Sequence, residues 1–523
     1  MDPLLAVVVL VAVVVAVSVL ARRFGLLAPI LLVIVGLTLS FVPDFPVPEV
    51  DPKFVIAGIL PPLLYVAALE TSVPAFKFNL RPILLLAVGH VLFISAAVGF
   101  VVHALLPAVP LAACFALGAV VAPPDAIAAT AVARRIGLPR RVVTILEGES
   151  LLNDATALVL FRVATAAAVG TAIGPAEITM EVFVAAGGGI AIGAIGAIVF
   201  RFLHVRTTDP LLDNAWSLLT PFVVAAAAEA IHGSGVVAVV VTGLYLGHRM
   251  PTLMSARSRL QMNAFWQMVK LLLEGLVFLV VGLQLRDIVA ALDTPFGELV
   301  GITLAVLGTV VIGRFVWVFP ATYLPRRIPR IRRRDPSPPW AVPAIISWAG
   351  MRGVVTLATA LALPAVLAGD APYPRALFVW LAFAVIVGTL VLQGTTLPVM
   401  SRLIRVPADD PVRDNLAEAQ VQNLASRIAR ERLDEHAGGA PEAVVERLRQ
   451  LTSDRSNAVW ERLGGVTETP SDAYVRLRRE MLDAEREVFR IARDEGRIPE
   501  EVLVRALRQM DLEESLLERD GDR

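Results

Sequence analysis

Long apolar runs recur through most of this 523-residue chain, from residue 4 to residue 404. Each run of about 17–25 residues is long enough to cross the hydrocarbon core of a bilayer as an α-helix. The first run is too long for a cleaved signal peptide and has no cationic segment before it, so we expect it to be retained. Because a lipid-embedded backbone must satisfy its own polar groups, the pattern predicts an all-α polytopic membrane protein and excludes a soluble globular one.

We expect about thirteen membrane spans. The pattern is least regular between residues 211 and 248, where Glu229, His232 and a glycine-rich turn interrupt the apolar sequence. An odd number of spans places the two ends of the membrane region on opposite sides of the bilayer. The predicted spans cover residues 4–21, 26–42, 54–70, 82–106, 110–133, 142–169, 181–203, 211–231, 234–248, 262–285, 297–323, 340–367 and 374–404.

Charged residues are segregated between alternate loops, although the formal net charge is zero. Under the positive-inside rule the basic loops face the cytoplasm, which predicts a plasma-membrane protein with its N-terminus outside and its C-terminus in the cytoplasm. The basic loops hold Arg22/Arg23, Lys77/Arg81, Arg134/Arg135/Arg140/Arg141, Arg201/Arg206, Arg249/Arg257/Arg259, Arg326 to Arg334, and Arg402/Arg405. The opposite loops hold mainly acids, namely Asp44, Glu49, Asp51, Glu177, Asp287, Asp293 and Asp370.

The composition changes abruptly after Arg405. Residues 406–523 are rich in charges of both signs, with apolar residues at helical spacing, which predicts a cytoplasmic helical domain separate from a transmembrane domain over residues 1–405. The tail has no nucleotide-binding glycine motif and no metal-ligand cluster. We therefore expect a stabilising or regulatory appendage, with no cofactor and no nucleic-acid partner.

Two predicted spans contain sequence that breaks helices. The fifth holds Pro123 and Pro124 directly before Asp125, and the twelfth holds Gly350 and Gly353 on either side of an arginine. Unwound backbone at membrane depth is tolerated only where it is buried in protein or lines a cavity. Interrupted spans in corresponding halves are typical of a midplane transport site in an inverted-repeat transporter, so we expect inverted repeats here.

Polar side chains concentrate at the start of the sixth span. At about 100° per residue, Ser150 and Asp154 lie one turn apart on one face, and Glu147 falls near the same stripe one turn earlier. Asn153 and Glu149 form a neighbouring stripe, with Glu149 directed away from Asp154. Intramembrane carboxylates are costly and usually functional.

Two carboxylates, Asp125 of the fifth span and Asp154 of the sixth, are predicted to lie near mid-membrane. Asp125 precedes the basic loop residue Arg134 by nine residues, and Asp154 follows Arg141 by thirteen. Together with Ser150 and carbonyls freed by the proline break they supply oxygen ligands, which hard cations prefer. Burial disfavours a charged carboxylate, so either a proton or a cation can neutralise Asp154. Competition for one carboxylate is sufficient for cation/proton exchange.

Four segments of the membrane region carry recognisable motifs. They are Leu60-Pro-Pro-Leu-Leu-Tyr65, Pro123-Pro124-Asp125, Gly148-Glu-Ser-Leu-Leu-Asn-Asp154 and Gly350-Met-Arg-Gly-Val354. Together they strongly resemble the motifs of bacterial sodium/proton antiporters of the cation:proton antiporter-1 family, and the resemblance covers the whole membrane region. It implies a thirteen-helix homodimer in which a six-helix core with crossed, unwound fifth and twelfth helices moves against a dimerisation domain.

The resemblance also implies roles for individual residues. By motif match Asp154 carries the ion and the proton, and Na⁺ is held by Asp154, Ser150 and the main-chain carbonyl of Pro124. Asp125 and Asn153 are implied site partners. Relatives with Asn-Asp in place of Asp-Asp are typically electroneutral, which fits one exchangeable carboxylate.

The chain departs from the family pattern at the third span. Val66 stands where many members have an acidic residue, and Glu70, one turn later, either reaches the cavity or sits at the cytoplasmic end of the helix. In the fifth span the proline precedes Asp125, whereas in many relatives it follows the aspartate. The sequence therefore does not decide which main-chain carbonyls bind the cation.

Several other charged residues receive structural or vestibule roles. A buried arginine needs a carboxylate, and the resemblance implies that Glu149 is the structural partner of Arg352. Glu274 is the alternative partner, although Lys270, one turn earlier, offers Glu274 a local pair. The candidates for a vestibule or secondary role are Glu147, Glu229 and Glu274, whereas Arg162 and Arg314 are expected to snorkel from helix ends.

The predicted function is exchange of a monovalent cation, Na⁺ or else Li⁺ or K⁺, for H⁺, and not an enzymatic reaction. A cation channel would need a continuous water-filled pore, and a neutralisable carboxylate between broken helices argues against that alternative. An intramembrane hydrolase built on Ser150 would need a nearby base, and Leu151 follows where such a protease has glycine.

Overall fold

The computed structural model describes residues 3–43, 45, 55–170, 174–364, 366–367, 373–407, 409–461, 470–495, 497 and 499–521. These residues form helices joined by loops, with no β-strand among them. The predicted acidic loop residues Asp44, Glu49, Asp51 and Asp370 lie outside this set. The chain divides into two compact units, Met1–Ala408 and Asp409–Arg523.

Long apolar helices dominate the first unit. Nine described helices are long and apolar enough to cross a membrane, and three shorter apolar ones cover residues 28–39, 55–70 and 111–121. Side chains such as Phe183 and Ile198 of α11 (Pro175–Arg206) are largely exposed, as suits a lipid-facing surface. The protein is therefore a multi-pass membrane protein, and the number of spans stays a prediction.

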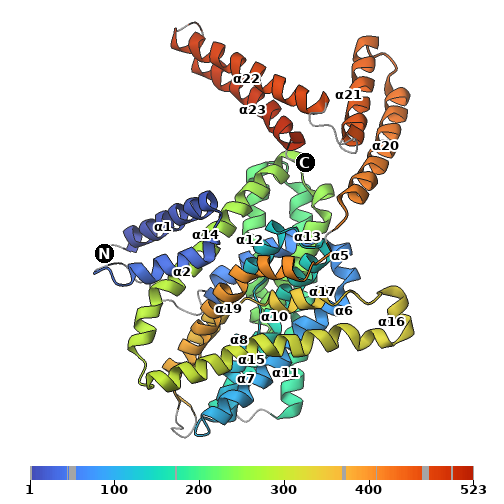
Figure 1. The fold of residues 1–523 in the computed structure, drawn as a ribbon. Helices are drawn as coiled ribbons and strands as arrows, with labels where there is room; N and C mark the ends of the chain where they lie inside the picture. The colour runs from blue at the N-terminus through green and yellow to red at the C-terminus, as the bar shows by residue number, and fades with distance from the viewer. Residues whose placement is uncertain are drawn as a thin grey trace. The chain divides into compact units, whose positions relative to one another are not determined.

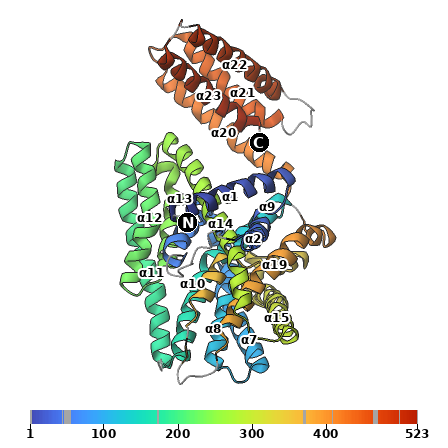
Figure 2. The ribbon, with the colours of Figure 1, turned by 90° about the vertical axis from the view of Figure 1, so that its left-hand side faces the viewer.

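The helices of the first unit pack in two groups (Figures 1 and 2). In the first group, α12 (Pro210–Ala230) and α13 (Gly235–Leu253) pack beside α11, and α13 also contacts α4 (Leu60–Glu70). The same group contains α14 (Ala256–Ala290), which contacts α2 (Ala28–Leu39), α1 (Pro3–Phe24) and α12. In the other, α7 (Val91–Leu105) packs on α8 (Leu111–Val121) and α15 (Phe296–Tyr323), and α15 contacts α19 (Arg375–Leu403). α10 (Arg140–Ala168) contacts α8 in one group and α4 and α13 in the other.

Short elements connect these long helices. They are the π-helical turns η1 (Val55–Ile59) and η2 (Leu85–His90), helices α5 (Val73–Phe78), α6 (Leu80–Leu84), α9 (Ala126–Arg135), α16 (Pro329–Arg334), α17 (Ala341–Trp348) and α18 (Val354–Leu361), and the 3₁₀ turn η3 (Pro325–Arg327).

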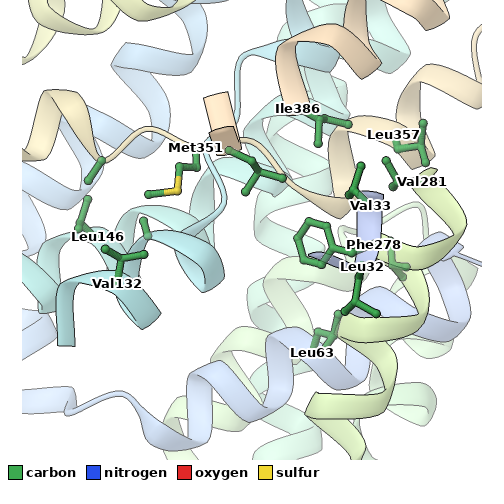
Figure 3. Packing of buried hydrophobic residues seen from close by; sticks show 14 of the residues in the cluster. Leu32, Val33, Leu63, Val132, Leu146, Phe278, Val281, Met351, Leu357 and Ile386 are labelled. Carbon is green, nitrogen blue, oxygen red and sulfur yellow. The ribbon is translucent and has the colours of Figure 1, made fainter. Parts of the chain in front are cut away.

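A buried apolar cluster joins helices of the two groups (Figure 3). Leu32 of α2 and Phe278 of α14 belong to it, as do Leu146 of α10 and Met351, which lies between α17 and α18. Because lipid tails are as apolar as these side chains, close packing rather than exclusion of water holds such helices together. The cluster thus fixes the non-helical backbone around Met351 against continuous helices.

The two spans with helix-breaking sequence are interrupted at the expected places. α8 ends at Val121 and α9 begins at Ala126, across the two prolines. α17 ends at Trp348 and α18 begins at Val354, and the main-chain N–H of Asp125 donates to the carbonyl of Met351 at 2.7 Å. A Cβ atom added at Gly353 would overlap the Asp125 carboxylate, so this close approach requires glycine.

The described residues of the second unit form four helices, α20 (Pro411–His436), α21 (Glu442–Glu461), α22 (Pro470–Asp494) and α23 (Glu500–Gly521). They pack as two pairs, α20 on α21 and α22 on α23. Leu482, Met510 and Leu517 form a small apolar core in the second pair, and Arg478 binds Glu513 at 2.7 Å. The helical spacing of the tail sequence therefore corresponds to amphipathic helices that cover each other's apolar faces.

Candidate functional site

A cavity of about 210 Å³ lies beside the interrupted helices and brings together most of the predicted site residues. Its walls come from α4, α9, α10, α14, α18 and the break between α8 and α9. Five carboxylates line it, together with two cations, three hydroxyl groups and two prolines of the break. These residues are Glu70, Asp125, Glu147, Asp154, Glu274, Arg134, Lys270, Ser150, Thr130, Thr356, Pro123 and Pro124.

Asp154 is a buried carboxylate that the uninterrupted helix α10 presents to this cavity. It is only 6% exposed, and Ser150, one turn earlier on α10, lines the same space. Asp125 reaches the cavity from the non-helical segment. Two carboxylates that share a buried space repel each other when both are charged, so a proton or a cation there relieves the repulsion.

Asn153 fastens α10 to the broken segment. Its amide Nδ2 donates to the Pro124 carbonyl at 2.6 Å, and the side chain is fully buried. A carbonyl oxygen accepts two hydrogen bonds or ligands, so the Pro124 oxygen retains one lone pair for a cation. The Asn153 Oδ1 atom has no hydrogen-bond partner within the described part of the chain.

Glu149 pairs with a different arginine from the one predicted. Both of its carboxylate oxygens accept from Arg314 of α15, at 2.6 and 2.7 Å, and the two side chains are 1% and 0% exposed. His90 Nδ1 lies 3.9 Å from the same carboxylate. The expectation that Glu149 binds Arg352, and that Arg314 snorkels to a helix end, is therefore wrong.

The Arg352 side chain instead donates hydrogen bonds to main-chain carbonyl groups. Its guanidinium donates to the carbonyls of Val121 and Ala122 at 3.0 and 3.2 Å and to that of Gly350, and its main-chain N–H donates to Thr389. Val121 and Ala122 are at the C-terminal end of α8, where unsatisfied carbonyls favour a cation. The arginine thus ties the two breaks together without a carboxylate.

The position of Arg314 could have been found from the sequence. Arg314 lies twelve residues before Arg326, the first residue of the basic loop. At 1.5 Å per residue this is about 18 Å along a helix, well inside the hydrocarbon region. The depth argument that located Asp125 and Asp154 therefore applies to Arg314 as well.

Two ion pairs lie among the residues that line the cavity. Arg134 binds Glu147 at 2.7 Å, and Lys270 lies 3.5 Å from Glu70. Lys270, which the helical spacing offers to Glu274 as a local partner, lies next to Glu70 instead. The Glu274 Oε1 atom is buried, and no hydrogen-bond partner for it lies among the residues that the structure describes. Glu70, at the last position of α4, therefore reaches the cavity while paired to a cation.

Glu229 lies apart from the other predicted carboxylates. It lines a separate, smaller cavity of about 30 Å³ together with Arg162 of α10. Leu64 of α4 lines both cavities. Since Asp154 faces the larger cavity and Ala155 the smaller, a thin apolar layer that includes Leu64 lies between the two spaces.

Interrupted membrane helices beside a buried carboxylate cavity are typical of membrane transporters that bind ions. The sequence model described as "Sodium/hydrogen exchanger, transmembrane" matches residues 8–403. The chain belongs to this family. The predicted family is confirmed, and the family is one of transporters rather than enzymes.

Individual relatives agree with this assignment. The chain is 36% identical to an uncharacterized Na⁺/H⁺ exchanger of Mycobacterium tuberculosis, over 98% of this chain and 95% of the relative. It is 30% identical to the sodium, potassium, lithium and rubidium/H⁺ antiporter of Bacillus subtilis, over 96% of this chain and 76% of the relative. The structure of the sodium proton antiporter MjNhaP1 from Methanocaldococcus jannaschii matches with a TM-score of 0.61 at 18% identity, covering 77% of this chain and 99% of that one, which shows the fold.

Proposed function

We propose that the protein exchanges Na⁺ for H⁺ across the plasma membrane, and that the two ions compete for Asp154. The observation that carries the proposal is the shared cavity, in which Asp154 and Ser150 of α10 meet Asp125 and the Pro124 segment. A buried carboxylate favours neutralisation, and it can be neutralised by either ion. Membership of the sodium/hydrogen exchanger family supports the proposal that competition between the two ions drives their exchange.

The proposed sodium ligands are oxygen atoms of Asp154 and Ser150 and the main-chain carbonyl of Pro124. Asn153 positions that carbonyl through its amide hydrogen bond. Asp125 supplies additional negative charge from the same cavity. With Asn153 in place of a second aspartate on α10, one carboxylate exchanges one cation for one proton, and the cycle is electroneutral.

The remaining carboxylates receive roles around this site. Glu147 and Glu70, each paired with a cation at the rim, form an inner vestibule. Glu274 lines the same cavity with its Oε1 atom buried and serves as a secondary cation contact. Glu229 and its smaller cavity form a vestibule on the opposite side of the Leu64 layer.

Transport would follow from movement of one helix group against the other. The proposed core contains α7, the interrupted pairs α8/α9 and α17/α18, and α10, α15 and α19, and the remaining helices of the first unit form a dimerisation domain. Crossing of the two breaks, thirteen spans with inverted repeats, the homodimer, and cytoplasmic placement of residues 406–523 belong to this proposal. The hydrogen bond between Asp125 and Met351 supports a direct crossing.

Selectivity for potassium is the second candidate. The name of the Bacillus subtilis relative includes sodium, potassium, lithium and rubidium, and that relative is 30% identical over most of this chain. Oxygen ligands serve each of these cations, and cavity size and ligand number decide among them. Exchange measured with Na⁺, Li⁺ and K⁺ in reconstituted vesicles separates the candidates.

The exchange proposal is tested in everted membrane vesicles that hold a preformed pH gradient. Added Na⁺ should collapse the gradient in vesicles with the wild-type protein, and Asp154→Asn should abolish the response. Glu298→Gln, which removes an exposed carboxylate in the first turn of α15 that does not line this cavity, is the control and should retain exchange. Sodium-driven collapse that survives in folded Asp154→Asn removes Asp154 from its proposed role.

A further inference from the structure

The loop between α15 and α17 carries an unusual excess of positive charge. Residues 324–340 contain six arginines and a single acidic residue, Asp335. Five of the arginines are exposed, and none of these five has an ion pair with any residue that the structure describes. We call them the basic segment: Arg327, Arg330, Arg332, Arg333 and Arg334.

The single carboxylate of this loop, Asp335, is bound by three other arginines. Asp335 accepts from Arg81 and Arg141 at 2.6 Å each, and from Arg326 at 2.7 Å. Burial raises the pKa of Asp335, but hydrogen bonds from Arg141 and Arg326 outweigh it and lower the pKa below its ordinary value. The carboxylate thus stays charged and bound to these three arginines, and it neutralises none of the basic segment.

The basic segment is held next to membrane-spanning sequence. It begins four residues after α15 ends at Tyr323, and α17 begins at Ala341, seven residues after it ends. Leu324, Ile328 and Trp340, which flank or interrupt it, are more than half exposed. Tryptophan and apolar side chains beside arginines are typical of the level where lipid headgroups meet acyl chains.

We propose that the basic segment is a binding surface for anionic phospholipid headgroups of the leaflet that it faces. The five guanidinium groups supply the charge and the donors for phosphate oxygens, and the exposed apolar side chains enter the acyl region. Clusters of four to eight basic residues directly beside a membrane helix favour anionic lipid in this way. The Asp335 contacts keep the segment at the end of α15 and next to the first turn of α10, which holds Arg141.

Retention of lipid by the purified full-length protein tests the proposal. The protein is solubilised from vesicles of phosphatidylcholine with or without phosphatidylglycerol, and the lipid that remains bound is measured by mass spectrometry. Wild-type protein should retain phosphatidylglycerol in preference to phosphatidylcholine. The quadruple Gln variant of Arg330, Arg332, Arg333 and Arg334 should lose that preference, and the corresponding quadruple Lys variant should keep it.

A matched control removes the same charge from the second unit. Replacing the exposed Arg413, Arg447, Arg505 and Arg508 by Gln should leave phosphatidylglycerol retention unchanged. If the quadruple Gln variant of the loop fails to fold, the single Arg332→Gln variant should weaken retention about fivefold, as expected for one arginine near an anionic surface. Undiminished preference in a folded loop variant overturns the proposal. Lipid is measured without transport, so this result is independent of the exchange proposal.

Discussion

The pair Glu149–Arg314 gives the sharpest stability prediction. Arg314→Leu would leave the Glu149 carboxylate buried, 1% exposed, without the guanidinium that now bonds both of its oxygens. Breaking one side of a buried ion pair costs about 3–5 kcal/mol, because the remaining charge has no compensation. Replacing both partners by apolar residues leaves no orphaned charge, so the double variant Glu149→Leu/Arg314→Leu should be more stable than either single variant.

Unfolding of the purified protein in detergent, followed by tryptophan fluorescence, measures these differences. Glu149→Leu, Arg314→Leu and the double variant form a double-mutant cycle, and Glu149→Leu with Arg352→Leu forms the comparison cycle. The coupling energy should be large in the first cycle and small in the second, since Arg352 bonds backbone carbonyls. A coupling to Arg352 that exceeds the coupling to Arg314 would refute the pairing.

Three further predictions concern the cavity and the loop. Gly353→Ala should abolish exchange in folded protein, because its Cβ would overlap the Asp125 carboxylate; unchanged initial rates in vesicles would contradict this close approach. Leu64→Ala should join the two cavities and allow ²²Na⁺ leakage in the absence of a pH gradient, and a tight variant would show that other residues seal the path. The pKa of Asp335 is lowered in the folded protein, so the stability lost in Asp335→Asn should be constant from about pH 8 to pH 5 and shrink below about pH 4, as the wild-type carboxylate is protonated; denaturant titrations across pH measure it.

The sequence was sufficient for the features that depend on one helix at a time. Apolar runs predict membrane helices, prolines and glycines predict breaks, and residue counts from basic loops give the depth of Asp125 and Asp154. The shared face of Ser150 and Asp154 follows from helical periodicity, and both residues do line one cavity. Each of these inferences uses only rise and rotation per residue.

Contacts between helices could not be predicted in the same way. Periodicity shows that Glu149 turns away from Asp154, but it does not show which neighbouring helix it meets, and Arg314 rather than Arg352 is there. Lys270 and Glu70 are likewise two hundred residues apart in sequence and adjacent in space. Pairing of buried charges is decided by packing of the helices, which no spacing rule encodes.

The central claim is that a cation and a proton compete for Asp154, and proton release on sodium binding tests it most directly. Na⁺ is added to purified, weakly buffered protein with a pH-sensitive dye, while bound ²²Na⁺ is counted in parallel. Wild-type protein should release one proton for each Na⁺ bound, and folded Asp154→Asn should release none. Sodium binding by the wild type without proton release, or undiminished release by the variant, would contradict the account.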